Sequence, residues 1–180
     1  MVMVSSSVLL FCRLTIGLTF AWAVLGKLRD LAAFREAVVD FRLLPEALSR
    51  NLAWVFLLAE CALLLMLGLG NALLLPGFVL SAGLLGLFSV ALGLVLRRSM
   101  QVSCNCFGVT ERRVSPYDVA RNLLLMVGSL VGCWTSLDAG EPVAGSTLLL
   151  LGLMALGLVI LVTNLADVVE TLRRPFPLNM

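Results

Sequence analysis

The longest apolar run in this sequence limits the fold more than any other feature. From Leu52 to Leu96 about 45 residues pass with almost no polar side chain, and a helix needs only roughly 20 residues to cross a bilayer. Gly70, Asn71 and Pro76 are the turn signals within this run, so we expect two antiparallel helices, at 52–70 and 73–96. A soluble core could not bury so much apolar surface, because 61% of the chain is hydrophobic and 13% is charged. The run predicts an integral membrane protein.

Three more apolar blocks complete the predicted bundle, at 8–28, 119–137 and 146–165. The first block is too long for the core of a signal peptide and no basic residue precedes it, so we expect it to remain as a helix. Residues 31–50 mix charges with apolar residues at helical spacing, which indicates a short amphipathic helix at the membrane surface. We expect residues 1–180 to form one all-α membrane domain, with a four-helix core, a fifth C-terminal span and this interfacial helix.

Positive charges alternate between the connecting segments and predict the orientation. Lysine and arginine occur between the first two spans, between the third and fourth, and in the tail, whereas the other connections and the first seven residues contain none. Cytoplasmic loops are enriched in these residues. We therefore expect a protein of the plasma or inner membrane, with its N-terminus outside and its C-terminus in the cytoplasm.

The composition excludes several classes of function. The chain contains no histidine, which removes a common metal ligand and the usual general base, so we expect no metal site. The net charge of +2 gives no indication of a nucleic-acid partner. The lipid bilayer is the first partner that the sequence predicts.

Cys104 and Cys106 are the candidate catalytic residues. They are the two cysteines, out of five, that lie in polar surroundings, and only Asn105 separates them. Thiols one residue apart can close a small, strained disulfide, and strained disulfides are more easily reduced. Nearby arginines, Arg97 and Arg113 among them, favour the reactive thiolate. The alternative is that Cys104 and Cys106 are two unrelated cysteines in a loop. In either case, the distribution of positive charges predicts that this loop lies on the cytoplasmic side.

Polar residues inside the predicted spans, or at their ends, form a second group of candidates. An ionised side chain in a bilayer costs at least a few kcal/mol, so it usually faces the bundle interior and a partner. Arg13 and Glu60 could pair, although their predicted depths differ; otherwise Arg13 reaches the membrane surface and Glu60 is protonated. Lys27, taken alone, is expected to be an interfacial anchor. Arg121 and Asn122 begin the span after the cysteines and could hydrogen-bond a thiolate.

Cys12 and Cys133 form a candidate second thiol pair. The predicted topology places both near the outer face, with Cys61 between them and the Cys104 segment. If they meet, thiol–disulfide exchange could pass reducing equivalents across the membrane. The alternative, which we favour, is that both cysteines are small apolar packing residues.

Taken in order, these residues resemble the MauE family of methylamine-utilisation proteins, which is grouped with DoxX-like redox-associated membrane proteins. The resemblance spans about residues 13–122 and rests on Arg13, Gly26-Lys27-Leu28, Leu43-Leu44-Pro45, Glu60, the Cys-Asn-Cys-Phe-Gly run at 104–108, and Arg121-Asn122. It implies a membrane protein that supports the maturation of disulfide-containing clients outside the cytoplasm, such as the small subunit of methylamine dehydrogenase. It also implies a thioredoxin-like partner. Cys104 and Cys106 would be the redox pair, within a polar framework of Arg13, Lys27, Glu60 and Arg121.

We therefore expect a membrane thiol–disulfide oxidoreductase that exchanges electrons through its CxC pair. A quinone or a second dithiol would be the other redox partner, and the sequence indicates no other cofactor. Two alternatives remain open: a non-enzymatic scaffold for a redox partner or client, and a bundle that binds a quinone or small molecule between Glu60 and Arg13. The clients implied by the resemblance lie outside the cytoplasm, whereas the arginines place the CxC pair inside. Three explanations would reconcile these positions. The protein relays electrons across the bilayer, or the loop with the CxC pair dips among the helices, or the predicted orientation is inverted.

Overall fold

The computed structural model describes residues 2–41, 45–98, 115–137 and 145–164, and this part of the chain is helical throughout. Cys104 and Cys106 lie outside the described residues. The helices, with one 3₁₀ turn labelled η1, are α1 (Val2–Arg29), α2 (Leu31–Asp40), α3 (Glu46–Leu69), η1 (Asn71–Leu73), α4 (Leu74–Arg97), α5 (Pro116–Leu137) and α6 (Gly145–Thr163).

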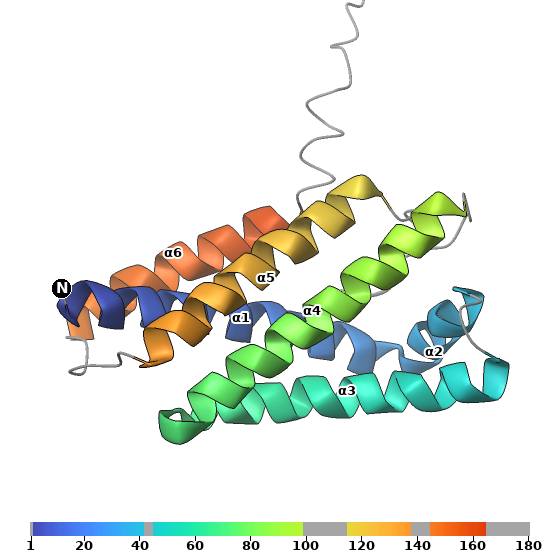
Figure 1. Ribbon diagram of the computed structural model, residues 1–180, viewed down its shortest axis with the longest axis horizontal. Helices are drawn as coiled ribbons and strands as arrows, with labels where there is room; N and C mark the ends of the chain where they lie inside the picture. Colours follow the sequence, from blue (N-terminus) through green and yellow to red (C-terminus); the bar gives the residue numbers. More distant parts are fainter. Residues whose placement is uncertain (1, 42–44, 99–114, 138–144, 165–180) are drawn as a thin grey trace, which may run out of the picture.

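The helices form a bundle around α1, which packs against α3, α5 and α6 (Figure 1). The α4 helix packs against α3 on one side and α5 on the other. The apolar core takes Ile16 from α1, Leu63 from α3, Phe78 from α4 and Leu125 from α5. Because Gly132 has no side chain, α5 approaches the Phe78 ring so closely that a Cβ at this position would overlap it.

Four helical segments are long and apolar enough to cross a membrane: Ser5–Arg29, Glu46–Leu69, Asn71–Arg97 and Pro116–Leu137. The shorter α6 contains the apolar stretch Thr147–Thr163. Large apolar side chains on the outside of the bundle are exposed, as lipid contact requires, because a bilayer solvates them. The predicted all-α membrane bundle, with its four-helix core and its further C-terminal helix, is confirmed.

The α2 helix occupies the region where we predicted an amphipathic segment. The side chain of Asp30 accepts a hydrogen bond from the backbone nitrogen of Ala33 (2.9 Å), and this cap separates α2 from α1. Phe34 and Ala37 are buried on the face that packs toward α1 and α3. Their burial matters for the site, because α2 covers the end of α1.

The turn between α3 and α4 lies where Gly70 and Asn71 predicted it. Gly70 adopts a φ of +74°, in the left-handed region that favours glycine, and it ends α3. Further along these helices, the Ser81 hydroxyl of α4 donates to the Ser129 hydroxyl of α5 at 2.8 Å. The turn sets α4 antiparallel to α3, and the serine contact fixes α4 on α5.

Candidate functional site

A buried ion pair joins α1 to α3. Lys27 lies in the last turn of α1, and its ammonium donates a hydrogen bond to Oε1 of Glu60; each side chain is 1% exposed. The ammonium also lies 4.9 Å from the ring centroid of Phe34 and 5.2 Å from that of Phe88, close enough for cation–π attraction. The expectation that Lys27 is an interfacial anchor is therefore wrong. Phe34 of α2 covers a lysine that would otherwise end a helix at the membrane surface.

A small cavity lies beside this ion pair. Its volume is about 20 Å³, which is roughly the space that one water molecule needs. Thr19, Phe88 and Asn122 line it together with the ion pair. Among the described residues, Oε2 of Glu60 is buried and has no hydrogen-bond partner. A carboxyl group and an amide that line such a space can both hydrogen-bond a water molecule, and the carboxyl group can also exchange a proton with it.

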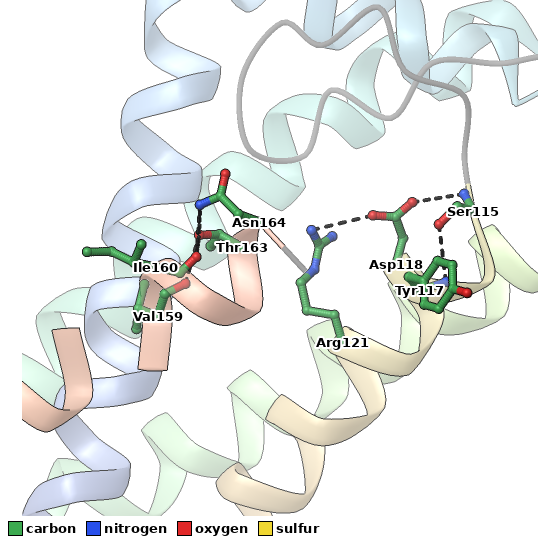
Figure 2. A network of polar contacts seen from close by, with 8 residues as sticks. All are labelled: Ser115, Tyr117, Asp118, Arg121, Val159, Ile160, Thr163 and Asn164. Atoms are coloured by element: carbon green, nitrogen blue, oxygen red, sulfur yellow. Dashed lines mark hydrogen bonds and ion pairs between the residues drawn. The ribbon is translucent and has the colours of Figure 1, made fainter. Parts of the chain in front are cut away.

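The start of α5 is a second polar cluster, drawn in Figure 2. The Ser115 hydroxyl accepts a hydrogen bond from the Tyr117 backbone nitrogen (3.2 Å), and Oδ2 of Asp118 accepts one from the Ser115 backbone nitrogen (2.9 Å). The two bonds cap the start of α5 in the manner of a capping box, and Pro116 occupies the first helical position, where a missing N–H costs nothing. The other oxygen of Asp118 lies 3.5 Å from the Arg121 guanidinium. Both charged side chains are buried.

From the sequence, we identified Arg121 and Asn122 as candidates but missed Asp118, although the Ser-x-x-Asp spacing before an apolar run is the sequence signal of a capping box. Arg121 pairs with Asp118, whereas Asn122 faces the cavity beside Lys27 and Glu60. The two clusters are therefore neighbours, connected through consecutive residues of α5.

Arg13 lies in a different place. Its Nε donates to the Leu67 carbonyl at 2.6 Å, and Nη2 donates to the Gly68 carbonyl at 2.9 Å, so the guanidinium caps the last turn of α3. A cation is favourable there, because the carbonyl end of a helix carries partial negative charge. The possible pairing of Arg13 with Glu60 is not formed, because the carboxylate of Glu60 pairs with Lys27 instead. Arg13 and Glu60 also line different cavities, so they do not form one binding pocket.

The described cysteines are Cys12, Cys61 and Cys133, and all three are free thiols. Cys12 is buried in the main apolar cluster, and Cys133 packs against the same cluster. Their shared cluster agrees with the packing role that we favoured, and their exchange with each other stays a prediction. The described residues contain no group of three or more acidic, cysteine or histidine side chains that could hold a metal ion.

The end of α6 is closed by its own polar side chains, which Figure 2 shows in the same view as the start of α5. The Asn164 amide donates to the Ile160 carbonyl at 2.8 Å, and the Thr163 hydroxyl donates to the Val159 carbonyl at 2.7 Å. These bonds satisfy carbonyls that a helix end leaves without partners.

Comparison with known proteins assigns the chain to a family. The family described as "Methylamine utilisation protein MauE" matches residues 5–135. The "Methylamine utilization protein MauE" of Paracoccus denitrificans is 36% identical over 159 residues, which are 86% of this chain and 84% of that protein. The protein of the same name from Paracoccus versutus is 36% identical over 143 residues, or 76% of this chain and 73% of that protein. No solved structure gives a significant match. The chain belongs to the MauE family of integral membrane proteins, as its motifs predicted.

Proposed function

We propose that this protein acts in methylamine utilisation as a membrane thiol–disulfide redox protein. The family assignment and the name of both relatives support the pathway. The reaction that we propose is disulfide exchange through Cys104 and Cys106 with a thioredoxin-like partner. This exchange would support maturation of a disulfide-containing client outside the cytoplasm, with the small subunit of methylamine dehydrogenase as the first candidate.

The observation that carries the proposal is the position of the buried polar clusters. The segment with the CxC pair leaves α4 after Arg98 and returns at Ser115, and the end of α4 and the start of α5 lie at the same end of the bundle as α2 (Figure 1). Asp118 and Arg121 follow within the first turns of α5, and Asn122 reaches the cavity beside the ion pair. Burying these charges in a membrane protein is costly, and such residues usually mark function.

The proposed exchange is a two-electron reaction. The thiolate of one CxC cysteine attacks a sulfur of the partner's disulfide, a mixed disulfide forms, and the partner's other sulfur leaves as a thiolate. The second cysteine then attacks the CxC sulfur of this mixed disulfide. The CxC bridge closes, and the partner is released as a dithiol that has gained two electrons and two protons. The reverse sequence oxidises the partner instead.

A second redox partner must reset the CxC pair, and we propose a quinone or another dithiol for this step. The cavity beside Glu60 measures about 20 Å³, which suits a water molecule and is far below the roughly 300 Å³ at which small-molecule pockets begin. The size of this cavity favours a water molecule over a quinone as its occupant. The proposed task of Glu60 is to fix Lys27 and to hold a proton-exchanging group next to Asn122.

The experiment that tests this function replaces both cysteines. Cys104→Ser/Cys106→Ser should stop the maturation of the methylamine dehydrogenase small subunit, measured as its disulfide content, while membrane insertion stays normal. Cys61→Ser is the matched control, because Cys61 is a partly exposed free thiol on α3, and it should leave maturation unchanged. Normal small-subunit disulfides in the double variant would rule out the redox role of the CxC pair. The non-enzymatic scaffold would then be the remaining explanation.

We further propose the plasma or inner membrane, with the N-terminus outside and the CxC segment and C-terminus in the cytoplasm. The alternation of basic residues supports this orientation. A variant that retains Cys104 as its only cysteine should resist a membrane-impermeant thiol reagent in intact cells and react after lysis. If Cys104 is labelled in intact cells, the proposed orientation is inverted, and the CxC pair lies on the same side of the membrane as its proposed clients.

A further inference from the structure

A groove between α1, α3 and α6 combines an apolar lining with a single charged residue. Its volume is about 460 Å³, within the range of about 300–1,000 Å³ typical of small-molecule sites. The α1 side runs from Leu10 to Ala21, and Leu64 of α3 and Leu148 of α6 complete the walls. Arg13 is the charged member of the lining.

The groove has a polar end and an apolar end. Arg13 contacts the last turn of α3, just before the turn at Gly70. Because non-helical backbone that is exposed to lipid is excluded from the hydrocarbon region, we expect this turn to lie near a membrane surface. The Arg13 end therefore lies close to one membrane surface. From there the groove follows α1 past Gly17 to Ala21, roughly 12 Å toward the membrane centre at about 1.5 Å per residue.

The guanidinium at the polar end can bind a further acceptor. Arginine has five N–H donors, and the contacts with the described residues use one on Nε and one on Nη2. The side chain is partly exposed, and it borders the groove. Phosphate is the anion that a guanidinium fork binds best, because two parallel N–H groups match two oxygens.

We propose that this groove binds one anionic phospholipid, with the headgroup phosphate on Arg13 and an acyl chain along α1. The charge complementarity favours this occupant: a cation at the membrane surface and purely apolar walls below it match an anionic head followed by hydrocarbon. The bound lipid would contact α1, α3 and α6 and stabilise their packing at the end of the bundle opposite α2. A neutral quinone would make no use of the positive charge.

Two glycines permit a test that leaves Arg13 in place. A Cβ on Gly17, which lines the groove, meets nothing within 4 Å, so the side chain of Gly17→Leu would begin in open space and occupy part of the groove. Gly83 of α4 is exposed, is equally open, and does not line the groove. Gly83→Leu is therefore a matched control for the added volume and for the change in helix propensity.

The experiment measures phospholipid bound to the full-length protein after purification in detergent, together with the melting temperature on addition of phosphatidylglycerol or phosphatidylcholine. The wild type and Gly83→Leu should each retain about one phospholipid per chain and be stabilised more by phosphatidylglycerol. Gly17→Leu should bind phosphatidylglycerol at least about tenfold more weakly, and Arg13→Gln should lose the preference for the anionic lipid, as loss of one charged hydrogen bond predicts. Equal lipid retention by Gly17→Leu and the wild type would overturn the proposal. So would a co-purified quinone in place of phospholipid.

Discussion

Removal of Lys27 should strongly destabilise the protein, because it leaves the buried carboxylate of Glu60 without its cation. Both members of the Lys27–Glu60 pair are 1% exposed, and breaking a buried pair from one side costs about 3–5 kcal/mol. Loss of the contacts between the ammonium and the rings of Phe34 and Phe88 adds about 0.5–2 kcal/mol. Since domains are stable by only about 5–15 kcal/mol, Lys27→Met should unfold a large fraction of the protein under mild denaturation.

A double-mutant cycle separates the ion pair from general damage. Lys27→Met/Glu60→Met replaces both charges with apolar side chains of similar size and should recover most of the loss, because a buried pair contributes little net stability over an apolar replacement. The free energy of unfolding, measured by denaturant titration in mixed micelles, should give a coupling energy of at least about 2 kcal/mol.

The chain offers a matched control in the ion pair between Glu46 and Arg50. This pair lies at 2.7 Å on one face of α3, but its side chains are 64% and 54% exposed. Arg50→Met should change the free energy of unfolding by about 0.5 kcal/mol or less, as exposed helical pairs do. If Lys27→Met is no more destabilising than Arg50→Met, the buried pair does not hold α1 to α3 as we argue.

Three further changes test other parts of the structure. Gly132→Ala should destabilise by about 1–3 kcal/mol in the same titration, since its Cβ overlaps the Phe78 ring; an unchanged midpoint would mean that α4 and α5 are not in close contact. Gly70→Ala should cost about 1–2 kcal/mol, because φ is +74° and the new Cβ would lie 3.2 Å from the Arg13 guanidinium; wild-type stability would contradict the left-handed turn. Asp118→Ala removes the side chain that accepts the Ser115 N–H and pairs with Arg121. Hydrogen exchange of the amides at the start of α5 should therefore accelerate by about 5–30-fold, equivalent to about 1–2 kcal/mol. An unchanged exchange rate would mean that Asp118 does not cap α5.

The helices could be predicted from the sequence, whereas the partners of the buried charges could not. Apolar length and the Gly70-Asn71 turn signal located α3 and α4, and the order of the motifs identified the family. The burial of Lys27 depends on Phe34 of α2, which contacts it only after the chain turns at Asp30. No periodicity within α1 encodes that contact.

Arg13 and Asp118 illustrate two different reasons for failure. The partners of Arg13 are backbone carbonyls of α3, and main-chain acceptors have no sequence signature. Asp118, by contrast, carried a readable signal in the sequence, because Ser115 lies three residues before it.

Thiol trapping in cells can show whether Cys104 and Cys106 cycle between dithiol and disulfide, as we propose. In a chain with Cys12, Cys61 and Cys133 replaced by serine, rapid alkylation of growing cells should reveal both redox forms of the remaining pair. Their ratio should shift when methylamine dehydrogenase is being made. A pair that stays entirely bridged, or entirely reduced, under every growth condition would contradict the proposed redox cycle.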